Sequence, residues 1–119
     1  SEVEHDIQLV EPVCQGCIIE YGHYKSKNMF LFCNPAAVDE RKFLTVKISF
    51  DDCKTWSNAK LIDGGRVQYS CMTILPNGNI GILYEIGWGG IHDLGIAFVS
   101  FHPDELFSPG TLLDDDVRM

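Results

Sequence analysis

Two residues at the ends of one predicted hairpin have side chains that could do chemistry together. The stretch 68–85 reads QYSCMTILPNGNIGILYE, in which two apolar runs flank the turn 76–79. The Asn-Gly pair in that turn accepts positive φ at little cost and is a strong hairpin signal. Folding the runs together brings the phenol of Tyr69 and the carboxylate of Glu85 to the same end. A phenol has a pKa of about 10, so it needs a neighbouring base to act as a nucleophile.

Other residues of suitable type have less specific surroundings. Arg41 follows two acidic residues, and an exposed ion pair is the ordinary role of such an arginine. Arg66 lies three residues before Tyr69 and is a competing guanidinium for any anion bound there. His92 and Asp93 could form a general base with its carboxylate. A pair flanked by glycine in a loop is, however, more often simply exposed.

The cysteines favour structural roles over metal binding. An odd count leaves at least one free thiol or an intermolecular bridge, and the density is too low for a disulfide scaffold. Cys14 and Cys17 have the C-x-x-C spacing, but no second such pair follows, so neither a metal nor another cofactor is expected. The five are Cys14, Cys17, Cys33, Cys53 and Cys71.

Length and charge limit the classes of protein to consider. The chain has 119 residues, enough for one modest domain or part of a larger one. Its net charge of −8 argues against nucleic acid and anionic membrane surfaces as partners. Segments 2–6 and 114–116 carry much of this charge and are expected to be solvated tails. No apolar run is long enough for a membrane span, and no N-terminal signal indicates a compartment. The lack of an initiator Met suggests that the chain begins partway through a longer product.

Short apolar runs separated by Gly, Pro, Asn and Asp predict an all-β fold. A four-stranded meander followed by a three-stranded one is expected, and tandem four-stranded meanders are the units of a β-propeller. One helical turn is expected over 102–107. The predicted strands are 16–21, 29–34, 43–50, 59–62, 69–75, 79–85 and 93–101.

In such meanders the connections alternate between two ends of the sheet. One end would carry Gln15, Arg41, the approach 64–69 and the segment 85–93. The other would carry the loops 22–27, 51–56 and 76–79. The groups with chemical potential are thus predicted to gather at one end.

The segment Ser49-Phe50-Asp51-Asp52-Cys53-Lys54-Thr55-Trp56 resembles the Asp-box, S-x-D-x-G-x-T-W, of sialidases and related propellers. In this motif the carboxylate and hydroxyls bond backbone groups of a turn between the third and fourth strands, and the Trp packs beneath. Cys53 replaces the usual Gly. Positive φ is disfavoured there, so the turn is expected to be either strained or slightly altered.

The resemblance extends in order and spacing through most of residues 11–101. The matching pieces are EPVCQGCIIEYG, MFLFCNPA, ERKFLTVKISFDDCKTW, QYSCMTILPNGNIGILYE and IAFVSF. They are similar to the C-terminal part of exo-α-sialidases (neuraminidases). The family domain is a six-bladed β-propeller, so the resemblance implies about two four-stranded blades. It implies a segment 1–14, a blade 15–63 with the Asp-box at 49–56, a last blade 64–107 and an acidic tail 108–119.

The resemblance also implies roles for three residues. Tyr69 matches the catalytic nucleophile, since sialidases are the glycosidases that use tyrosine in this role. The carboxylate of sialic acid would repel an attacking Asp or Glu, whereas a neutral phenol is not repelled. Arg41 matches one of three arginines that grip the substrate carboxylate. Glu85 matches a glutamate that orients another of these arginines.

Some positions depart from the family pattern or carry no role. Gln15 lies on the same predicted end, with no role implied. Cys71 replaces the family's aspartate after Tyr-Ser, and Cys17 replaces its serine after Cys-Gln-Gly. Both departures leave Tyr69, Arg41 and Glu85 intact.

The implied function is retaining hydrolysis of terminal sialic acid from glycoconjugates. The implied partners are a sialylated glycan and further blades from the rest of the protein or another chain, because the acid/base Asp and the tyrosine's partner Glu have no match here. Two blades alone would also leave unpaired strand edges. The alternative is a non-catalytic Asp-box propeller or a carbohydrate-binding module, which has no need of all three residues.

Overall fold

The computed structural model describes residues 16–35, 42–86, 95–108 and 110, and the side chains at 42, 58, 59 and 68 are not described. The described chain is all-β apart from one short 3₁₀-helix, η1, which confirms the predicted fold class. Its elements are β1 (Cys17–Tyr24), β2 (Lys27–Pro35), β3 (Lys42–Ser49), β4 (Ser57–Ile74), β5 (Ile80–Ile86), β6 (Gly95–Phe101) and η1 (Pro103–Phe107).

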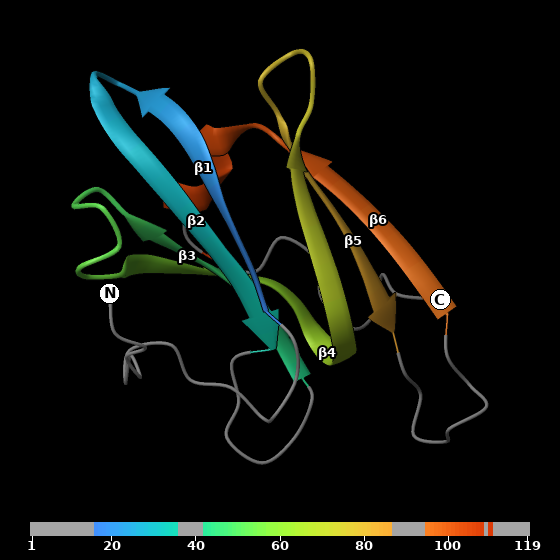
Figure 1. Cartoon of the computed structure of the whole chain (residues 1–119). Helices are drawn as coiled ribbons and strands as arrows, with labels where there is room; N and C mark the ends of the chain where they lie inside the picture. The colour runs from blue at the N-terminus through green and yellow to red at the C-terminus, as the bar shows by residue number, and fades with distance from the viewer. Residues whose placement is uncertain (1–15, 36–41, 87–94, 109, 111–119) are drawn as a thin grey trace.

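The six strands pair antiparallel in chain order. β4 pairs with β3 through its first part, as far as Arg66, and with β5 from Val67 onward. Figure 1 shows the result: β1, β2, β3 and the start of β4 form one group, and the rest of β4 with β5 and β6 forms another. One continuous strand therefore belongs to two meanders.

The prediction of separate strands at 59–62 and 69–75 was wrong, because both lie in the single strand β4, which has 18 residues. The approach 64–69, expected as a connection, is part of this strand. Gly64 and Gly65 read as a break in the sequence. The residues that flank them are nevertheless paired with β3, since Asp63 faces Leu44 and Arg66 faces Lys42.

The first loop is also shorter than predicted. β1 continues to Tyr24 and β2 begins at Lys27, so only Lys25 and Ser26 form the turn. Both have positive φ, of 49° and 71°. Two consecutive residues with positive φ make the type of tight turn that matches strand twist, and this lets the hairpin extend into the segment expected as a loop.

The strand registers define two ends of the fold. At the junction end, where β4 changes partner, lie the start of β1, the end of β2, the start of β3, the end of β5 and the start of β6. At the opposite, turn end lie the connections 25–26, 50–56 and 75–79. This agrees with the two ends predicted from strand counting.

A single apolar core joins the two groups of strands. Leu31 and Val46 of the first group and Ile82 of the second are fully buried members of one cluster. The Tyr21 hydroxyl donates a hydrogen bond of 2.7 Å to the Gly78 carbonyl, which links β1 to the β4–β5 turn. η1 closes the turn end with buried Leu106 and confirms the predicted helical turn.

The turn 50–56 between β3 and β4 is organised by one carboxylate. Asp51 Oδ1 accepts hydrogen bonds from the Thr55 backbone N–H at 2.8 Å and from Ser49 Oγ at 2.8 Å. Its Oδ2 accepts from Thr55 Oγ1 at 2.5 Å. Trp56 is buried, with its ring 5.9 Å from that of Phe32. The bonding predicted for this segment is present.

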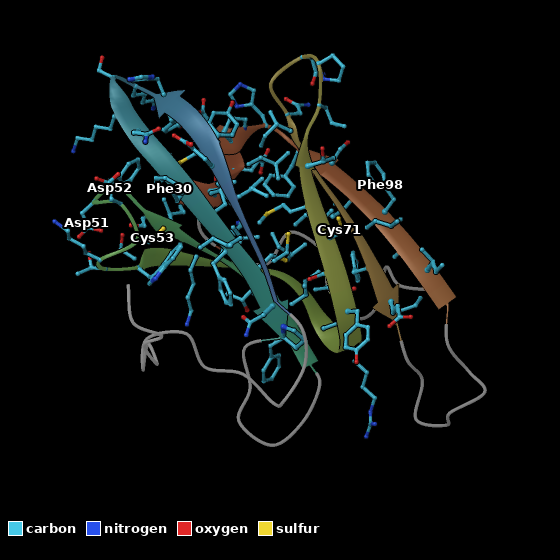
Figure 2. The ribbon with its side chains drawn as sticks, viewed as in Figure 1. Phe30, Asp51, Asp52, Cys53, Cys71 and Phe98 are labelled. Atoms are coloured by element: carbon cyan, nitrogen blue, oxygen red, sulfur yellow. The ribbon has the colours of Figure 1, made fainter. Side chains whose placement is uncertain are left out.

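Cys53 keeps the backbone geometry that a glycine would have at this position. Its φ is 68°, and that of Asp52 is 59°. Its backbone N–H donates a hydrogen bond of 2.9 Å to Ser49 Oγ, which closes the turn. Of the two expected outcomes, strain is therefore the one observed, since a left-handed backbone at an L-residue costs roughly 1–2 kcal/mol. Figure 2 shows Asp51, Asp52 and Cys53 gathered in this turn, at the side of the fold away from β6.

The hydrogen bonds at Asp51 predict a pH-dependent stability. Bonds from the Thr55 hydroxyl and backbone, and then from Ser49, lower the pKa of Asp51 from 3.8 to about 2. The folded-state pKa lies below the unfolded one, so the ionised carboxylate stabilises the fold above about pH 4. This contribution is lost as the pH falls from about 4 to about 2. The melting-temperature difference between wild type and Asp51→Asn should therefore be large at pH 6 and shrink toward pH 2.

Asp52→Asn is the matched control. It removes a carboxylate from the same turn and keeps a residue type that tolerates φ of 59°. Its melting temperature should follow the wild type across the same pH range. A pH-independent deficit for Asp51→Asn would contradict the ionic role of Asp51.

Candidate functional site

Tyr69 lies in a β-bulge directly opposite Glu85. Val67 pairs with Ile86 and Ser70 pairs with Tyr84, so residues 68 and 69 of β4 both face Glu85 of β5. A bulge adds a residue on one strand and redirects the side chains around it, and such irregularities are common beside functional sites. The sequence correctly predicts that Tyr69 and Glu85 share one end of the hairpin.

Tyr69 and Glu85 line one shallow depression of about 280 Å³ at the junction end. Tyr69 is 48% exposed. Leu83 and Ile96 form an apolar wall, and Cys71 lies two residues beyond the tyrosine on the same strand. The depression therefore combines a phenol, a carboxylate and apolar surface.

A buried pair supports this depression from the other side of the sheet. Tyr84 is the residue before Glu85 and faces the core, where its hydroxyl donates 2.9 Å to Oδ2 of Asp63. Asp63 is 1% exposed, and its Oδ1 accepts from the Gly65 backbone N–H at 2.9 Å. The pair ties β4, just before its change of partner, to β5 beside the bulge. It thereby fixes the backbone that carries Tyr69 and Glu85.

Sequence reasoning missed both members of this pair. Asp63 reads as a turn residue because two glycines follow it, and Tyr84 reads as an apolar strand position. The usable signal is the alternation in β5. Glu85 faces the depression, so Tyr84 must face the core, where a buried hydroxyl needs an acceptor.

Most of the remaining predicted site residues lie outside the part of the chain that the structure describes. Arg41, Gln15, His92 and Asp93 lie outside the described residues. Arg66 is exposed and faces Lys42 of β3 across the ladder at the junction end. The structure thus brings Tyr69 and Glu85 together, and the role of Arg41 stays a prediction.

Four of the five cysteines are described, and all four are free thiols. Cys33 is fully buried opposite Cys17, whose Sγ accepts a 3.4 Å hydrogen bond from the Met72 backbone N–H. Burial is the main cause that raises the pKa of Cys33 to about 12, so this thiol stays protonated.

Within the described ranges, no cluster of three His, Cys, Asp or Glu side chains could hold a metal ion. Over the same residues, no helix has the length and apolarity to cross a membrane.

Two features characterise this chain for comparison with known proteins. It has two antiparallel meanders, and a tyrosine in a bulge lies opposite a glutamate at one end. No protein-family model matches the chain. It is 41% identical over 90 residues to a sialidase of Micromonospora viridifaciens. The match covers 71% of this chain and 14% of that protein. It is 35% identical over 83 residues to a sialidase of Bacteroides fragilis (strain YCH46), covering 65% of this chain and 15% of that protein.

Solved structures of a sialidase and a trans-sialidase are also similar to this chain. The Hadza microbial sialidase Hz136 superposes with a TM-score of 0.67 at 30% identity, over 82% of this chain and 19% of that one. The intramolecular trans-sialidase of Ruminococcus gnavus superposes with a TM-score of 0.64 at 26% identity, over 82% of this chain and 24% of that one.

The chain belongs to the sialidase family and corresponds to part of the larger family enzymes. Its two meanders are similar to part of a sialidase propeller, as predicted. It spans only 14% and 15% of the length of the two sialidases that it matches by sequence.

The buried pair yields a stability prediction. Tyr84→Phe removes a hydroxyl that donates to a carboxylate that is 1% exposed. Such a loss costs about 1–3 kcal/mol, which should lower the melting temperature measured by calorimetry. Tyr21→Phe is the matched control, because it removes a hydroxyl that bonds only a part-buried neutral carbonyl. An equal effect of the two changes would contradict a special role for Asp63 and Tyr84.

Proposed function

We propose that the protein carrying this chain is a retaining exo-α-sialidase, a glycoside hydrolase that removes terminal sialic acid from glycoconjugates. The observation that carries the proposal is the bulge that sets Tyr69 opposite Glu85, in a chain 41% identical to a sialidase over 90 residues. In the resemblance to sialidases, Tyr69 matches the nucleophile and Glu85 matches the glutamate that orients an arginine.

In this mechanism the oxygen of Tyr69 attacks the anomeric carbon as the bond to the leaving group breaks, and an acid from another part of the protein protonates the leaving oxygen. The phenol proton passes to a base contributed by another part of the protein. Water then cleaves the tyrosyl–sialyl bond, and two displacements return the original configuration. The neutral phenol avoids the repulsion that an Asp or Glu nucleophile would meet from the substrate carboxylate.

Arg41 binds the substrate carboxylate in this proposal, and Glu85 orients a second arginine. A guanidinium offers two parallel N–H donors to the two carboxylate oxygens, a geometry that an ammonium lacks. Glu85 therefore acts through an arginine supplied from elsewhere in the protein.

The chain is proposed to be one part of a longer catalytic domain, with further blades supplied by the rest of the protein or by another chain. This is supported by its coverage of 14% of a sialidase that it matches. The outer face of the second meander adds support. Phe98 does not line the depression and is 57% exposed, so a neighbouring blade would cover this apolar side chain. Figure 2 shows Cys71 and Phe98 on the outer strands of this meander, β4 and β6.

The division into a blade over 15–63 and a last blade over 64–107 stays a prediction. The change of partner after Arg66 lies close to that boundary. A non-catalytic propeller or carbohydrate-binding module is the second candidate. It shares the organised turn at 50–56 but gives no reason for a phenol and a carboxylate to meet in a bulge.

The assignment of Tyr69 as the nucleophile predicts that removing its hydroxyl oxygen lowers kcat. Tyr69→Phe in the protein that carries this chain should lower kcat for a fluorogenic sialoside by at least about 10³-fold, because the attacking oxygen is lost. Tyr21→Phe, which removes a hydroxyl at the turn end, should leave kcat unchanged. Full activity of Tyr69→Phe would sink the assignment. No activity in the unsubstituted protein would favour the non-catalytic candidate.

The two candidate arginines can be separated by paired substitutions. Arg41→Lys keeps the charge and loses the two-donor geometry, so kcat/KM should fall by roughly 10- to 100-fold. Arg66→Lys should change it little. The reverse ranking in steady-state kinetics would transfer the clamp to Arg66.

A further inference from the structure

An aromatic pocket lies at the turn end, on the opposite end of the fold from Tyr69. It has a volume of about 250 Å³ and draws its lining from separate parts of the chain. These are the β1–β2 hairpin, the residue after β3, and η1, which Figure 1 shows behind β1. The lining residues are Tyr24, Lys25, Lys27, Phe50 and Phe107.

Three nearly parallel rings form the apolar part of this pocket. Phe107 stacks on Tyr24 with ring centroids 5.4 Å apart and 10° between the planes. It also lies 6.4 Å from Phe50 at 17°. Phe107 is 41% exposed, so part of this aromatic surface faces solvent.

Two ammonium groups flank the rings. Lys25 Nζ is 5.3 Å from the centre of the Tyr24 ring, and Lys27 Nζ is 5.6 Å from the centre of the Phe50 ring. Asp104 lies near the first: it accepts a hydrogen bond from the Tyr24 hydroxyl, and its Oδ1 is 4.0 Å from Lys25 Nζ. Within the described part of the chain, no carboxylate lies within ion-pair distance of Lys27.

The aromatic contacts do hold η1 against the first meander, but that role requires no cations at the pocket. Lys25 and Lys27 make this pocket locally positive in a chain of net charge −8. A suitable ligand presents an apolar ring face to the aromatic surface and an anionic group to Lys27.

We propose that the aromatic pocket is a second glycan-binding site that takes a carboxylate-bearing sugar. The apolar face of the pyranose ring covers the exposed part of Phe107, and the sugar carboxylate accepts hydrogen bonds from Lys27. The choice of a sugar over another ring-bearing anion rests on the proposed function. Because the pocket and Tyr69 lie at opposite ends, the second site would hold one branch of a glycan while another is cleaved.

The test places a reporter inside the pocket. Phe107→4-fluorophenylalanine, in the protein that carries this chain, gives a fluorine NMR signal that senses this site independently of the depression at Tyr69. Titration with free sialic acid should shift the signal saturably. The methyl ester of sialic acid has the same ring without the charge and should bind at least about tenfold more weakly.

Two matched variants test the charge. Lys27→Gln should weaken the binding of sialic acid by about tenfold. Lys54 does not line the pocket, so Lys54→Gln removes one positive charge nearby and should leave binding unchanged. An equal loss from both changes would mean that only the overall charge matters, and would overturn the proposed contact.

The remaining outcomes are equally decisive. No shift with sialic acid, or equal binding of its methyl ester, overturns the site. A shift with benzoate but none with sialic acid would assign the pocket to planar aromatic anions instead. Hydrolysis of a sialoside is measured separately, so failure of this inference and failure of the proposed function are distinguishable.

Discussion

The continuity of β4 is the constraint on which the rest of the structure depends. Because one strand completes the first meander and begins the second, the placement of β3 fixes that of β5. Because β4 is one continuous strand, no free connection separates the two groups of strands. The shared core and the bond from Tyr21 to Gly78 then hold the groups face to face. The depression at the junction end exists because β4 changes partner there.

The bulge shapes the candidate site within this architecture. A regular ladder continued from the Ile74–Ile80 pair would set Tyr69 opposite Glu85 one to one. The extra residue instead places two β4 residues against one and turns the local backbone. The buried carboxylate of Asp63, bonded to Tyr84, holds the sheet in that irregular form. Tyr69 and Glu85 on one face are thus supported by the hydrogen-bonded pair of Tyr84 and Asp63 on the other.

The sequence predicted the all-β class, the hairpin that joins Tyr69 to Glu85, and the hydrogen bonds of the turn 50–56. These features depend on local signals, such as an Asn-Gly turn and short polar side chains at fixed spacing. It failed at β4 because Gly64 and Gly65 carry no local sign that the strand continues through them. It also missed Asp63 and Tyr84, since their pairing depends on which face of the sheet meets the core. Long-range pairing and burial are properties of the assembled fold.

The choice between strain and rearrangement at Cys53 was likewise open from the sequence. The structure keeps the left-handed backbone, and the cost is offset by the hydrogen bonds around Asp51. Local hydrogen bonding there outweighs the preference of the residue itself.

The unbroken course of β4 also bears on how such a fold can be divided. Tandem meanders are usually treated as modules that can be copied, lost or exchanged at the connections between them. Here the border between the meanders lies inside a hydrogen-bonded strand, so a cut there would leave two half-strands without a natural terminus. The smallest exchangeable unit is therefore the pair of meanders, and recombination that respects the fold must enter at the turns.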